Sequence, residues 1–268
     1  MTQIDEARHR EQVHSERFVQ VAGLQTQVLT SGSGPPVLVL HHDIGNPGWL
    51  PFYEALASRF SVFVPSFPGY GASERAEWLR SVRDLAAVEQ WLLKELALDD
   101  VSLVGLGFGG WVAAEMASLS PRQFRRLVLV GAMGIKPAAG EILDQAILNH
   151  EDYVRAGFYD QAHFDAVFGS EPDTDRLEQW DIHRETTFRI AWKPYMYNPT
   201  LPHLLGGVEA PSMVVWGRED RVVPLECGEH YHQALPEARL RVIEGCGHYV
   251  EMEKPDELAT LIMEFAGG

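Results

Sequence analysis

One stretch of the chain decides its fold: Val101-Ser102-Leu103-Val104-Gly105-Leu106-Gly107-Phe108-Gly109-Gly110-Trp111-Val112-Ala113-Ala114-Glu115-Met116-Ala117. Its first four residues form a short, nearly apolar run that predicts a buried strand. The glycines that follow predict a tight turn, because glycine lets two backbone segments pass close to each other. The remaining residues predict a helix, and a strand, turn and helix in this order indicate an α/β fold.

The alternation of strands and helices continues on both sides of this stretch. Seven further short runs are rich in β-branched and other apolar residues: Phe18–Val21, Leu24–Leu29, Val37–Leu40, Val62–Val64, Leu127–Val130, Met213–Trp216 and Leu240–Ile243. Helical patterns occur at Phe52–Ser58, Val82–Leu96, Gly110–Leu119, Leu225–Ala234 and Pro255–Phe265. We therefore predict an α/β protein with a doubly wound, mostly parallel sheet of the eight-stranded type, in which the first two strands form an antiparallel hairpin.

Residues 136–205 interrupt this alternation. The interval is too long for a structureless loop, and its pattern is mostly helical. It is also rich in aromatic residues: Tyr153, Phe158, Tyr159, Phe164, Phe168, Trp180, Phe188, Trp192, Tyr195 and Tyr197. We predict that residues 136–205 form an inserted helical cap and that residues 1–135 and 206–268 form the core of a single domain. Such a cap would line an apolar pocket over the site.

The composition excludes several classes of function. The chain has 268 residues, of which 46% are hydrophobic, and a formal net charge of −16. An acidic protein without a basic stripe repels the phosphate backbone, so we expect no nucleic-acid partner. We expect no membrane span either, because no apolar run reaches the roughly 20 residues needed, and residues 1–16 lack the apolar core of a signal peptide. The two cysteines, Cys227 and Cys246, have no CxxC spacing, which favours a reducing cytoplasm.

The glycine-rich turn resembles the nucleophile elbow, G-x-S-x-G, of the α/β-hydrolase superfamily. Further segments resemble the landmarks of this family in their usual order: the strand ending in His-Gly at residues 37–42, the D-x-P-G-x-G-x-S segment at 65–73, the acid-bearing turn at 215–224 and the histidine-bearing loop at 245–248. The resemblance covers nearly the whole chain from residue 18 and implies the α/β-hydrolase fold. The chain departs from the family at one decisive position, because Gly107 stands where the elbow has its nucleophile.

The same glycines also fit a dinucleotide-binding pattern, G-x-G-x-x-G, at Gly105, Gly107 and Gly110. That pattern normally follows the first strand of its unit, and an acidic residue comes about 20 positions later. In this chain several strands come first, and Arg125 and Arg126 stand at that distance. We therefore expect no nucleotide and no other cofactor.

Asp220 and His248 match the acid and the base of the family. A turn carboxylate and a buried, satisfied histidine are the alternatives for the two residues. Asp220 lies between a buried strand and Pro224, and His248 follows about 28 residues later in a glycine-rich loop. The resemblance implies that Asp220 fixes the tautomer of His248 and that His248 acts as a general base.

Glycine at position 107 allows two interpretations. In the first, the protein is a binding relic or a disabled serine hydrolase, in which glycine relieves the strain of the elbow and ends acyl-enzyme chemistry. In the second, the missing side chain makes room for a water molecule that His248 deprotonates. We favour the second interpretation, because an obsolete site has no need to keep both Asp220 and His248.

The oxyanion side of the expected site also differs from the family. The backbone N–H of Phe108, at the start of the helix, is one expected donor. The second donor usually comes from the loop after His41, where the family has small residues and this chain has His42 and Asp43. A carboxylate aimed at a developing oxyanion would destabilise it. Either Asp43 points away, or the chemistry is not ordinary acyl transfer.

A metal site built from His41, His42, Asp43 and His248 is an alternative, since imidazole and carboxylate suit a divalent ion. Adjacent residues of an extended strand point to opposite faces, so His41 and His42 do not easily converge. We therefore expect one of the two to be structural and no metal to bind. Four histidines of the inserted segment are expected to be solvated or structural: His150, His163, His183 and His203.

These observations predict a cofactor-independent hydrolase that acts on a small, partly apolar carbonyl substrate. The bond broken would belong to an ester, a lactone or a C–C linkage, and water would attack with the help of His248 and Asp220, without an acyl-enzyme. Two alternatives stay open. One is a lyase or isomerase in which His248 only moves a proton, and the other is a non-catalytic ligand-binding protein.

Overall fold

The computed structural model describes residues 14–267, which contain one eight-stranded sheet of order β1-β2-β4-β3-β5-β6-β7-β8. The strands are β1 (Ser15–Val21), β2 (Leu24–Ser31), β3 (Pro36–Leu40), β4 (Ser61–Pro65), β5 (Val101–Leu106), β6 (Phe124–Val130), β7 (Ser212–Gly217) and β8 (Arg239–Ile243). β1 pairs with β2 and β2 with β4 in antiparallel fashion, whereas the pairs from β4 to β8 are parallel. The predicted mostly parallel sheet with a leading hairpin is confirmed.

Parallel pairing brings the carboxyl ends of the central strands to one edge of the sheet. Leu40 at the end of β3 pairs with Gly105 of β5, and Leu106 at the end of β5 pairs with Val130 at the end of β6. The loops that follow these strands therefore leave the sheet side by side. This carboxyl edge is where open α/β sheets bind their ligands.

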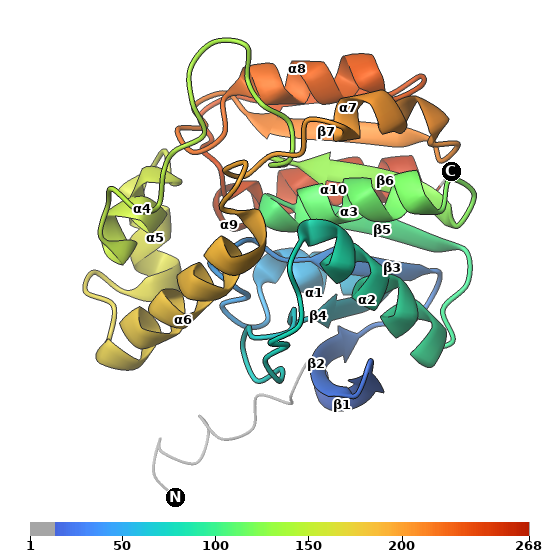
Figure 1. Ribbon diagram of the computed structural model, residues 1–268, viewed down its shortest axis with the longest axis horizontal. Coiled ribbons are helices and arrows are strands. Elements are labelled where there is room, and N and C mark those ends of the chain that lie inside the picture. The colour runs from blue at the N-terminus through green and yellow to red at the C-terminus, as the bar shows by residue number, and fades with distance from the viewer. Residues whose placement is uncertain (1–13, 268) are drawn as a thin grey trace, which may run out of the picture.

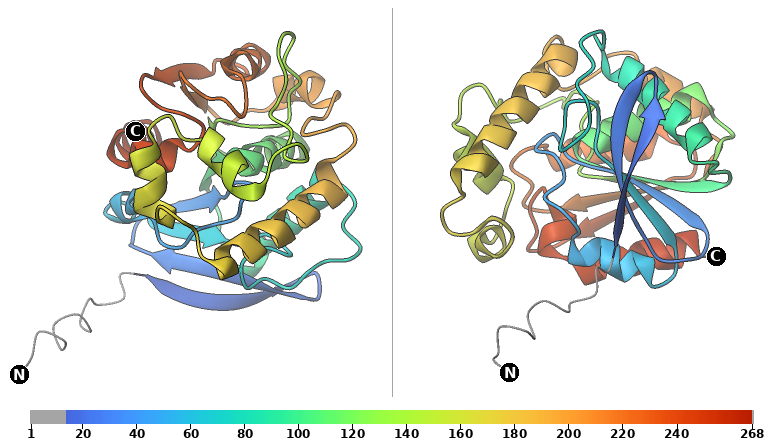
Figure 2. Two further views of the ribbon diagram at one scale, coloured as in Figure 1. Left: turned by 90° about the vertical axis from the view of Figure 1, so that its left-hand side faces the viewer. Right: turned by 90° about the horizontal axis from the view of Figure 1, so that it is seen from below.

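Helices cover both faces of the sheet (Figure 1 and Figure 2). On one face α1 (Pro51–Ala57) packs against α10 (Pro255–Ala266), and on the other α2 (Val82–Glu95) packs against α3 (Phe108–Leu119). Helix α8 (Leu225–Ala234) packs against β7. Two short helices complete the core: α7 (Leu201–Leu204) and α9 (Val250–Glu253). Cover on both faces explains why β5 and β7 are buried along their whole length.

Helix α3 passes very close to the end of β3. A Cβ atom on Gly109 would lie 2.3 Å from the carbonyl oxygen of Leu40, so a larger residue does not fit there. The backbone N–H of Gly109 donates to the carbonyl of His41 at 3.0 Å. This contact fixes the start of α3 against the loop that carries His42 and Asp43.

The chain between β6 and β7 contributes α4 (His150–Ala156), α5 (Gln161–Phe168) and α6 (Thr174–Ala191). Figure 1 shows these three helices grouped beside the loops at the carboxyl edge. His183 of α6 fastens the group to two of these loops, since its Nδ1 donates to the carbonyl of Ile44 at 2.8 Å and its Nε2 accepts from the N–H of Gly71 at 3.2 Å. The division into a core and a cap of residues 136–205 stays a prediction.

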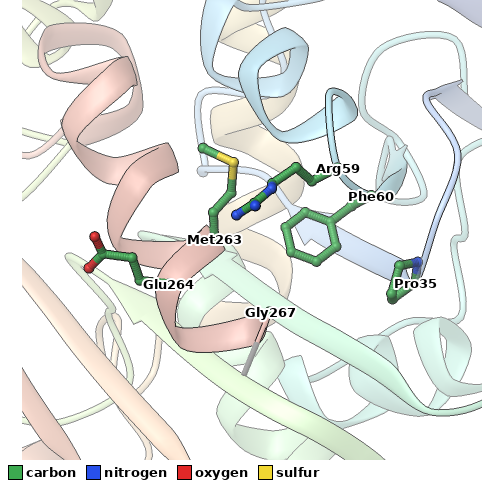
Figure 3. A pocket seen from close by; sticks show the side chains of 6 residues that line it. All are labelled: Pro35, Arg59, Phe60, Met263, Glu264 and Gly267. Atoms are coloured by element: carbon green, nitrogen blue, oxygen red, sulfur yellow. The ribbon is translucent and has the colours of Figure 1, made fainter.

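A pocket lies at the opposite edge of the sheet (Figure 3). It has a volume of about 450 Å³, and its lining residues are Pro35, Arg59, Phe60, Met263, Glu264 and Gly267. Pro35 and Phe60 come directly before β3 and β4, so this pocket opens beside the amino ends of the strands. It is separated by the length of the sheet from the loops that carry the expected site.

Two expectations from the sequence concern segments outside the sheet. Among residues 14–267, no helix combines the length and the apolar character that a membrane crossing requires. The expectation of a polar leading segment without a signal peptide falls mainly on residues 1–13, which lie outside the described part of the chain.

Glu89 of α2 makes the stability of the core depend on pH. Its side chain is fully buried, and neither carboxylate oxygen has a hydrogen-bond partner among the described residues. Burial raises the pKa of Glu89 from 4.5 to about 8. Between these two values the folded state keeps the proton and the unfolded chain loses it. The free energy of unfolding therefore falls as the pH rises, by about 1.4 kcal/mol for each pH unit.

We expect Glu89→Gln to remove this loss, because the amide cannot ionise. Urea unfolding at several pH values checks this: the advantage of the variant should grow as the pH rises from about 5 to 8 and then level off. The exposed Glu257→Gln is the matched control and should track the parent. A stability difference that is the same at every pH would contradict the prediction.

Candidate functional site

The turn between β5 and α3 has the geometry expected of an elbow. Gly107 is the N-cap of α3 and has φ 51° and ψ −111°, a backbone conformation that residues other than glycine rarely adopt. Its N–H donates to the carbonyl of Val130 at 2.8 Å, and its carbonyl accepts from the N–H of Met133 at 3.0 Å. The elbow is thus tied to the end of β6.

Asp220 and His248 form a buried pair across the ends of β7 and β8. The Nδ1 atom of His248 lies 2.8 Å from Oδ2 of Asp220. The other oxygen of Asp220 accepts from the N–H groups of Val222 and Val223, both at 2.8 Å. These bonds hold the carboxylate in place, so the pair can fix the tautomer of His248.

Several neighbouring carboxylates together outweigh the effect of burial on His248. Burial is the largest single influence and lowers the pKa of this imidazole, but the charge of Asp220, its hydrogen bond with Nδ1 and the charges of Asp43 and Glu251 jointly raise the pKa above the ordinary value. The second ring nitrogen, Nε2, faces the elbow and lies 2.9 Å from the point where a Cβ atom of residue 107 would stand. His248 therefore faces the glycine, as the sequence predicts.

The ring of His42 fills the space beside the elbow. Its Nδ1 lies only 2.1 Å from the position of a Cβ atom on residue 107, so any side chain there would displace the ring. The opposite nitrogen, Nε2, lies 3.2 Å from the carboxylate of Glu251, which is completely buried. The rings of His42 and His248 meet edge to face, with their centres 4.9 Å apart.

Asp43 points into the site. Its Oδ2 accepts hydrogen bonds from the hydroxyl of Tyr153, at 2.8 Å, and from the side-chain amide of Gln145. Burial raises the pKa of Tyr153 well above its ordinary range, so the hydroxyl stays protonated and acts as the donor. The other oxygen, Oδ1, has no hydrogen-bond partner among residues 14–267. The first option left by the sequence, an Asp43 that points away from the site, is therefore not what the structure shows.

His41 lies outside this group, as the alternation of side chains along a strand predicts. Its Nδ1 lies 2.6 Å from the carbonyl of His42, and its Nε2 accepts from the N–H of Phe67 at 3.0 Å. Burial lowers the pKa of His41 to about 3, so the ring stays neutral. His41 joins the loops after β3 and β4 and has a structural role.

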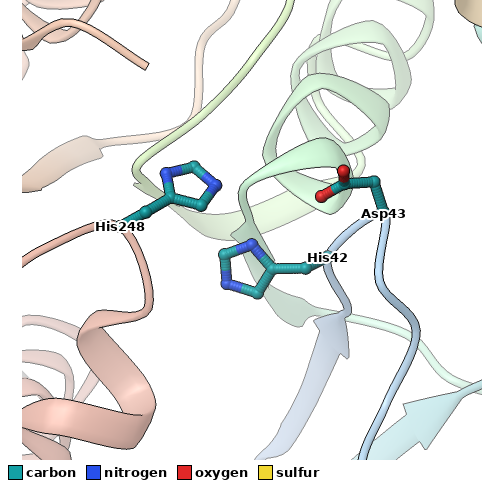
Figure 4. A group of neighbouring side chains, drawn as sticks. All are labelled: His42, Asp43 and His248. Carbon is teal, nitrogen blue, oxygen red and sulfur yellow. The ribbon is translucent and has the colours of Figure 1, made fainter. Parts of the chain in front are cut away.

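Figure 4 shows the rings of His42 and His248 and the carboxylate of Asp43 turned toward one another. Each residue offers one atom that can bind a ligand, and these three atoms all lie within 4.8 Å of one another. The side chains are at most 2% exposed. Phe108 completes the site as the first residue of α3, where a backbone N–H has no partner within the helix.

Sequence reasoning missed the residues that hold His42 and Asp43. Glu251 lies three positions after His248 in α9, and Tyr153 and Gln145 come from the segment between β6 and β7. A glutamate in the apolar run from Tyr249 to Met252 was the available signal, because carboxylates are rarely buried without a partner. Nothing in the sequence pattern indicates which of many tyrosines contacts Asp43.

Comparison with known proteins settles the family. A model of the Alpha/beta hydrolase family matches residues 37–261, which include Gly107, Asp220 and His248. The chain belongs to the alpha/beta hydrolase family. The predicted α/β-hydrolase fold is confirmed, and that Gly107 stands at the position of the family's nucleophile stays a prediction.

Relatives within the alpha/beta hydrolase family are similar to this chain over most of its length. The 2-hydroxy-6-oxononadienedioate/2-hydroxy-6-oxononatrienedioate hydrolase of Paraburkholderia phymatum is 29% identical over 92% of this chain and 88% of that protein. The 2-hydroxymuconate semialdehyde hydrolase of Pseudomonas sp. is 27% identical over 93% of each chain. Both relatives are named as hydrolases of small molecules.

Solved structures of this family show the same fold. A meta-cleavage product hydrolase from Pseudomonas fluorescens IP01 has a TM-score of 0.78 and 22% identity, covering 94% of this chain and 97% of its own. The 2-hydroxy-6-oxo-6-phenylhexa-2,4-dienoate hydrolase from Rhodococcus sp. strain RHA1 has a TM-score of 0.75 and 22% identity, covering 95% and 99%. At this identity the likeness concerns the fold alone.

Gly107→Ala should destabilise the protein more than Gly23→Ala does. Both glycines have a positive φ, 51° and 82°, which costs an alanine about 1 kcal/mol. Only at residue 107 does the new Cβ meet the rings of His42 and His248, whereas nothing lies within 4 Å at Gly23. We expect an additional loss of about 1–3 kcal/mol in urea unfolding. Equal losses would show that His42 does not fill the space beside the elbow.

Proposed function

We propose that the protein is a hydrolase in which a water molecule, rather than a serine, attacks a carbonyl carbon. The observation that carries this proposal is the replacement of the nucleophile by Gly107 while Asp220 and His248 stay hydrogen-bonded at 2.8 Å beside it. An acyl-enzyme at the elbow is excluded, because glycine has no side chain to acylate. The attacking oxygen must therefore come from the solvent.

No nearby serine replaces the missing nucleophile in this proposal. Ser66 donates its hydroxyl to the side-chain oxygen of Gln27 at 2.8 Å, and Ser73 donates to the backbone carbonyl of Ser66 at 2.7 Å. Both hydroxyls are engaged in the loop after β4. Neither hydroxyl is hydrogen-bonded to His248, the base that pairs with Asp220 and that would have to activate a serine.

His248 and Asp220 would assist the water by the logic of a catalytic dyad. Because Nδ1 carries the hydrogen bonded to Asp220, Nε2 presents its lone pair toward the elbow, where a water proton can be accepted. The carboxylate then stabilises the imidazolium that forms. Negative charge that develops on the carbonyl oxygen would be met by the N–H of Phe108 at the start of α3.

The substrate class rests on the relatives and on the lining of the site. The similar proteins are named as hydrolases of 2-hydroxy-6-oxo-dienoate compounds, and the site of this chain is enclosed by aromatic side chains such as Tyr153 and Tyr249. A small, partly apolar carbonyl compound suits such an enclosure. We therefore propose hydrolysis of a C–C, ester or lactone bond.

The test is turnover of a panel of such compounds, 2-hydroxymuconate semialdehyde included, by the parent and by His248→Ala. Loss of the base should lower kcat by about 10²–10⁴-fold. His230→Gln is the matched control, because this partly exposed histidine of α8 also contacts a carboxylate, that of Glu226 at 4.0 Å on the same helix. The product must carry one added water by mass. A product of unchanged mass would point to a lyase or isomerase, and full activity in His248→Ala would overturn the proposal.

Gly107→Ser should lower turnover of the native substrate instead of improving it. The new side chain would have to displace His42, whose Nδ1 lies 2.1 Å from the Cβ position. A shift of about 1 Å in a catalytic group can cost about 10²-fold. Steady-state kinetics on the best substrate of the panel and on an activated aryl ester provide the measurement. A serine variant that is much faster on both compounds would identify the parent as a disabled serine hydrolase.

A further inference from the structure

We propose that His42, Asp43 and His248 bind one divalent transition-metal ion, of which Zn²⁺ is the type. The proposed site lies between the loop after β3 and the loop after β8, beside the elbow at Gly107. This proposal goes beyond the proposed function, because the binding of an ion can be tested without any catalytic activity. Only the catalytic role that is given to the ion below rests on the proposed function.

The first support is convergence. One ligand atom from each residue lies within 4.8 Å of the other two, and all three side chains are buried (Figure 4). A Zn²⁺ ion with bonds of about 2.1 Å in tetrahedral geometry needs ligand atoms about 3.4 Å apart. Each ligand atom would have to move by less than about 1 Å to close this difference.

The second support is that three buried polar atoms lack a protein partner. Among residues 14–267, Nδ1 of His42, Oδ1 of Asp43 and Nε2 of His248 have no hydrogen-bond partner. Buried polar atoms without a partner are uncommon and destabilising, so each one calls for an explanation. A shared ligand explains all three at once.

The third support is the outer contact that each proposed ligand makes. His248 bonds to Asp220 at 2.8 Å through Nδ1, His42 contacts Glu251 at 3.2 Å through Nε2, and Asp43 bonds to Tyr153 at 2.8 Å through Oδ2. Histidines that bind metals usually donate their other N–H to a carboxylate, which turns the free lone pair to the ion. Both imidazoles here show this arrangement.

The charge of the site also favours a cation. Asp43, Asp220 and Glu251 are three buried carboxylates around two imidazoles. In the described residues their hydrogen bonds go to His, Tyr and Gln side chains and to backbone N–H groups, and none goes to Lys or Arg. Burying such an excess of negative charge is unfavourable unless a cation balances it.

Gly107 gives the ion its space. A Cβ atom at this position would lie 2.1 Å from Nδ1 of His42 and 2.9 Å from Nε2 of His248, in contact with both proposed ligand atoms. A serine would therefore exclude the His42 ring from its present place. The present place of the His42 ring thus depends on glycine at residue 107.

The sequence analysis considered His41, His42, Asp43 and His248 together and expected no metal, because His41 and His42 do not easily converge. In the structure only His41 leaves this set, since its Nε2 accepts from the N–H of Phe67. His42, Asp43 and His248 avoid that restriction, because Asp43 follows the strand and His248 comes from another loop. Two imidazoles and a carboxylate suit Zn²⁺ and similar ions and do not suit Mg²⁺ or Ca²⁺, which prefer oxygen ligands.

Such an ion would supply the activation of water in the proposed function, because coordination lowers the pKa of bound water. His42, Asp43 and His248 would hold the ion. Hydrolysis there would add one water across the bond that breaks, with the proton of the water passing to the leaving group and nothing oxidised or reduced. Because Nε2 of His248 would then be a ligand, the role of base proposed above would belong to the protein without the ion.

The experiment is metal binding by the full chain after treatment with a chelator. Calorimetric titration with Zn²⁺ should give one ion per chain, Mg²⁺ should give no binding, and Co²⁺ should produce the visible absorption of a nitrogen- and oxygen-ligated site. Asp43→Asn should weaken Zn²⁺ binding by about 100-fold or more, and Glu251→Gln by about 10–100-fold. His230→Gln, which removes a partly exposed histidine of α8 that contacts Glu226 at 4.0 Å, should bind like the parent.

The outcomes separate this proposal from the proposed function. Zn²⁺ binding that is absent, or unchanged in both Asp43→Asn and Glu251→Gln, overturns the metal site. If Asp43→Asn does not fold, Glu251→Gln and the Co²⁺ spectrum decide. One tightly bound ion without turnover of any carbonyl compound supports the metal site and overturns the proposed hydrolase activity. Turnover that persists after complete removal of metal supports the hydrolase and overturns the catalytic role of the ion.

Discussion

The missing Cβ atom at residue 107 is the constraint on which the rest of the site depends. The backbone at this turn has φ 51°, and Nδ1 of His42 lies 2.1 Å from the point where a Cβ would stand. The ring of His42 therefore exists in its present place only because residue 107 is glycine. Glu251 holds the far side of that ring at 3.2 Å and is itself fully buried. Elbow, ring and carboxylate form one packed unit.

Burial makes the carboxylates of this unit depend on hydrogen bonds and on neighbouring charges. A carboxylate taken out of water is costly unless hydrogen bonds or opposite charges compensate. Asp220 obtains two backbone N–H groups and His248, whereas the carboxylate of Asp43 lies near the two imidazoles and its Oδ1 atom has no partner among the described residues. The site therefore gathers several unpartnered buried polar atoms, which are uncommon in a packed core.

The sequence predicts the sheet and its helices well because their signals are local or are family landmarks. The apolar run at residues 101–104 and the glycines after it correspond to β5 and the elbow, and the spacing of Asp220 and His248 predicts their pairing. The direction of Asp43 could not be predicted, since it depends on a hydroxyl from α4 more than 100 positions away. Helix α9 has four residues, too few for a periodic pattern, so the role of Glu251 was also missed.

The contact between Tyr153 and Asp43 links the helices between β6 and β7 to the assembly of the site. His248, His42 and Asp43 are at most 2% exposed, so a molecule cannot touch them until neighbouring residues move. Displacing α4 would break the 2.8 Å bond from Tyr153 that orients Asp43. A form of the protein with α4 displaced would lack this bond, and Asp43 would be less well oriented in it. The free energy of such an opening would lower the observed affinity for a ligand.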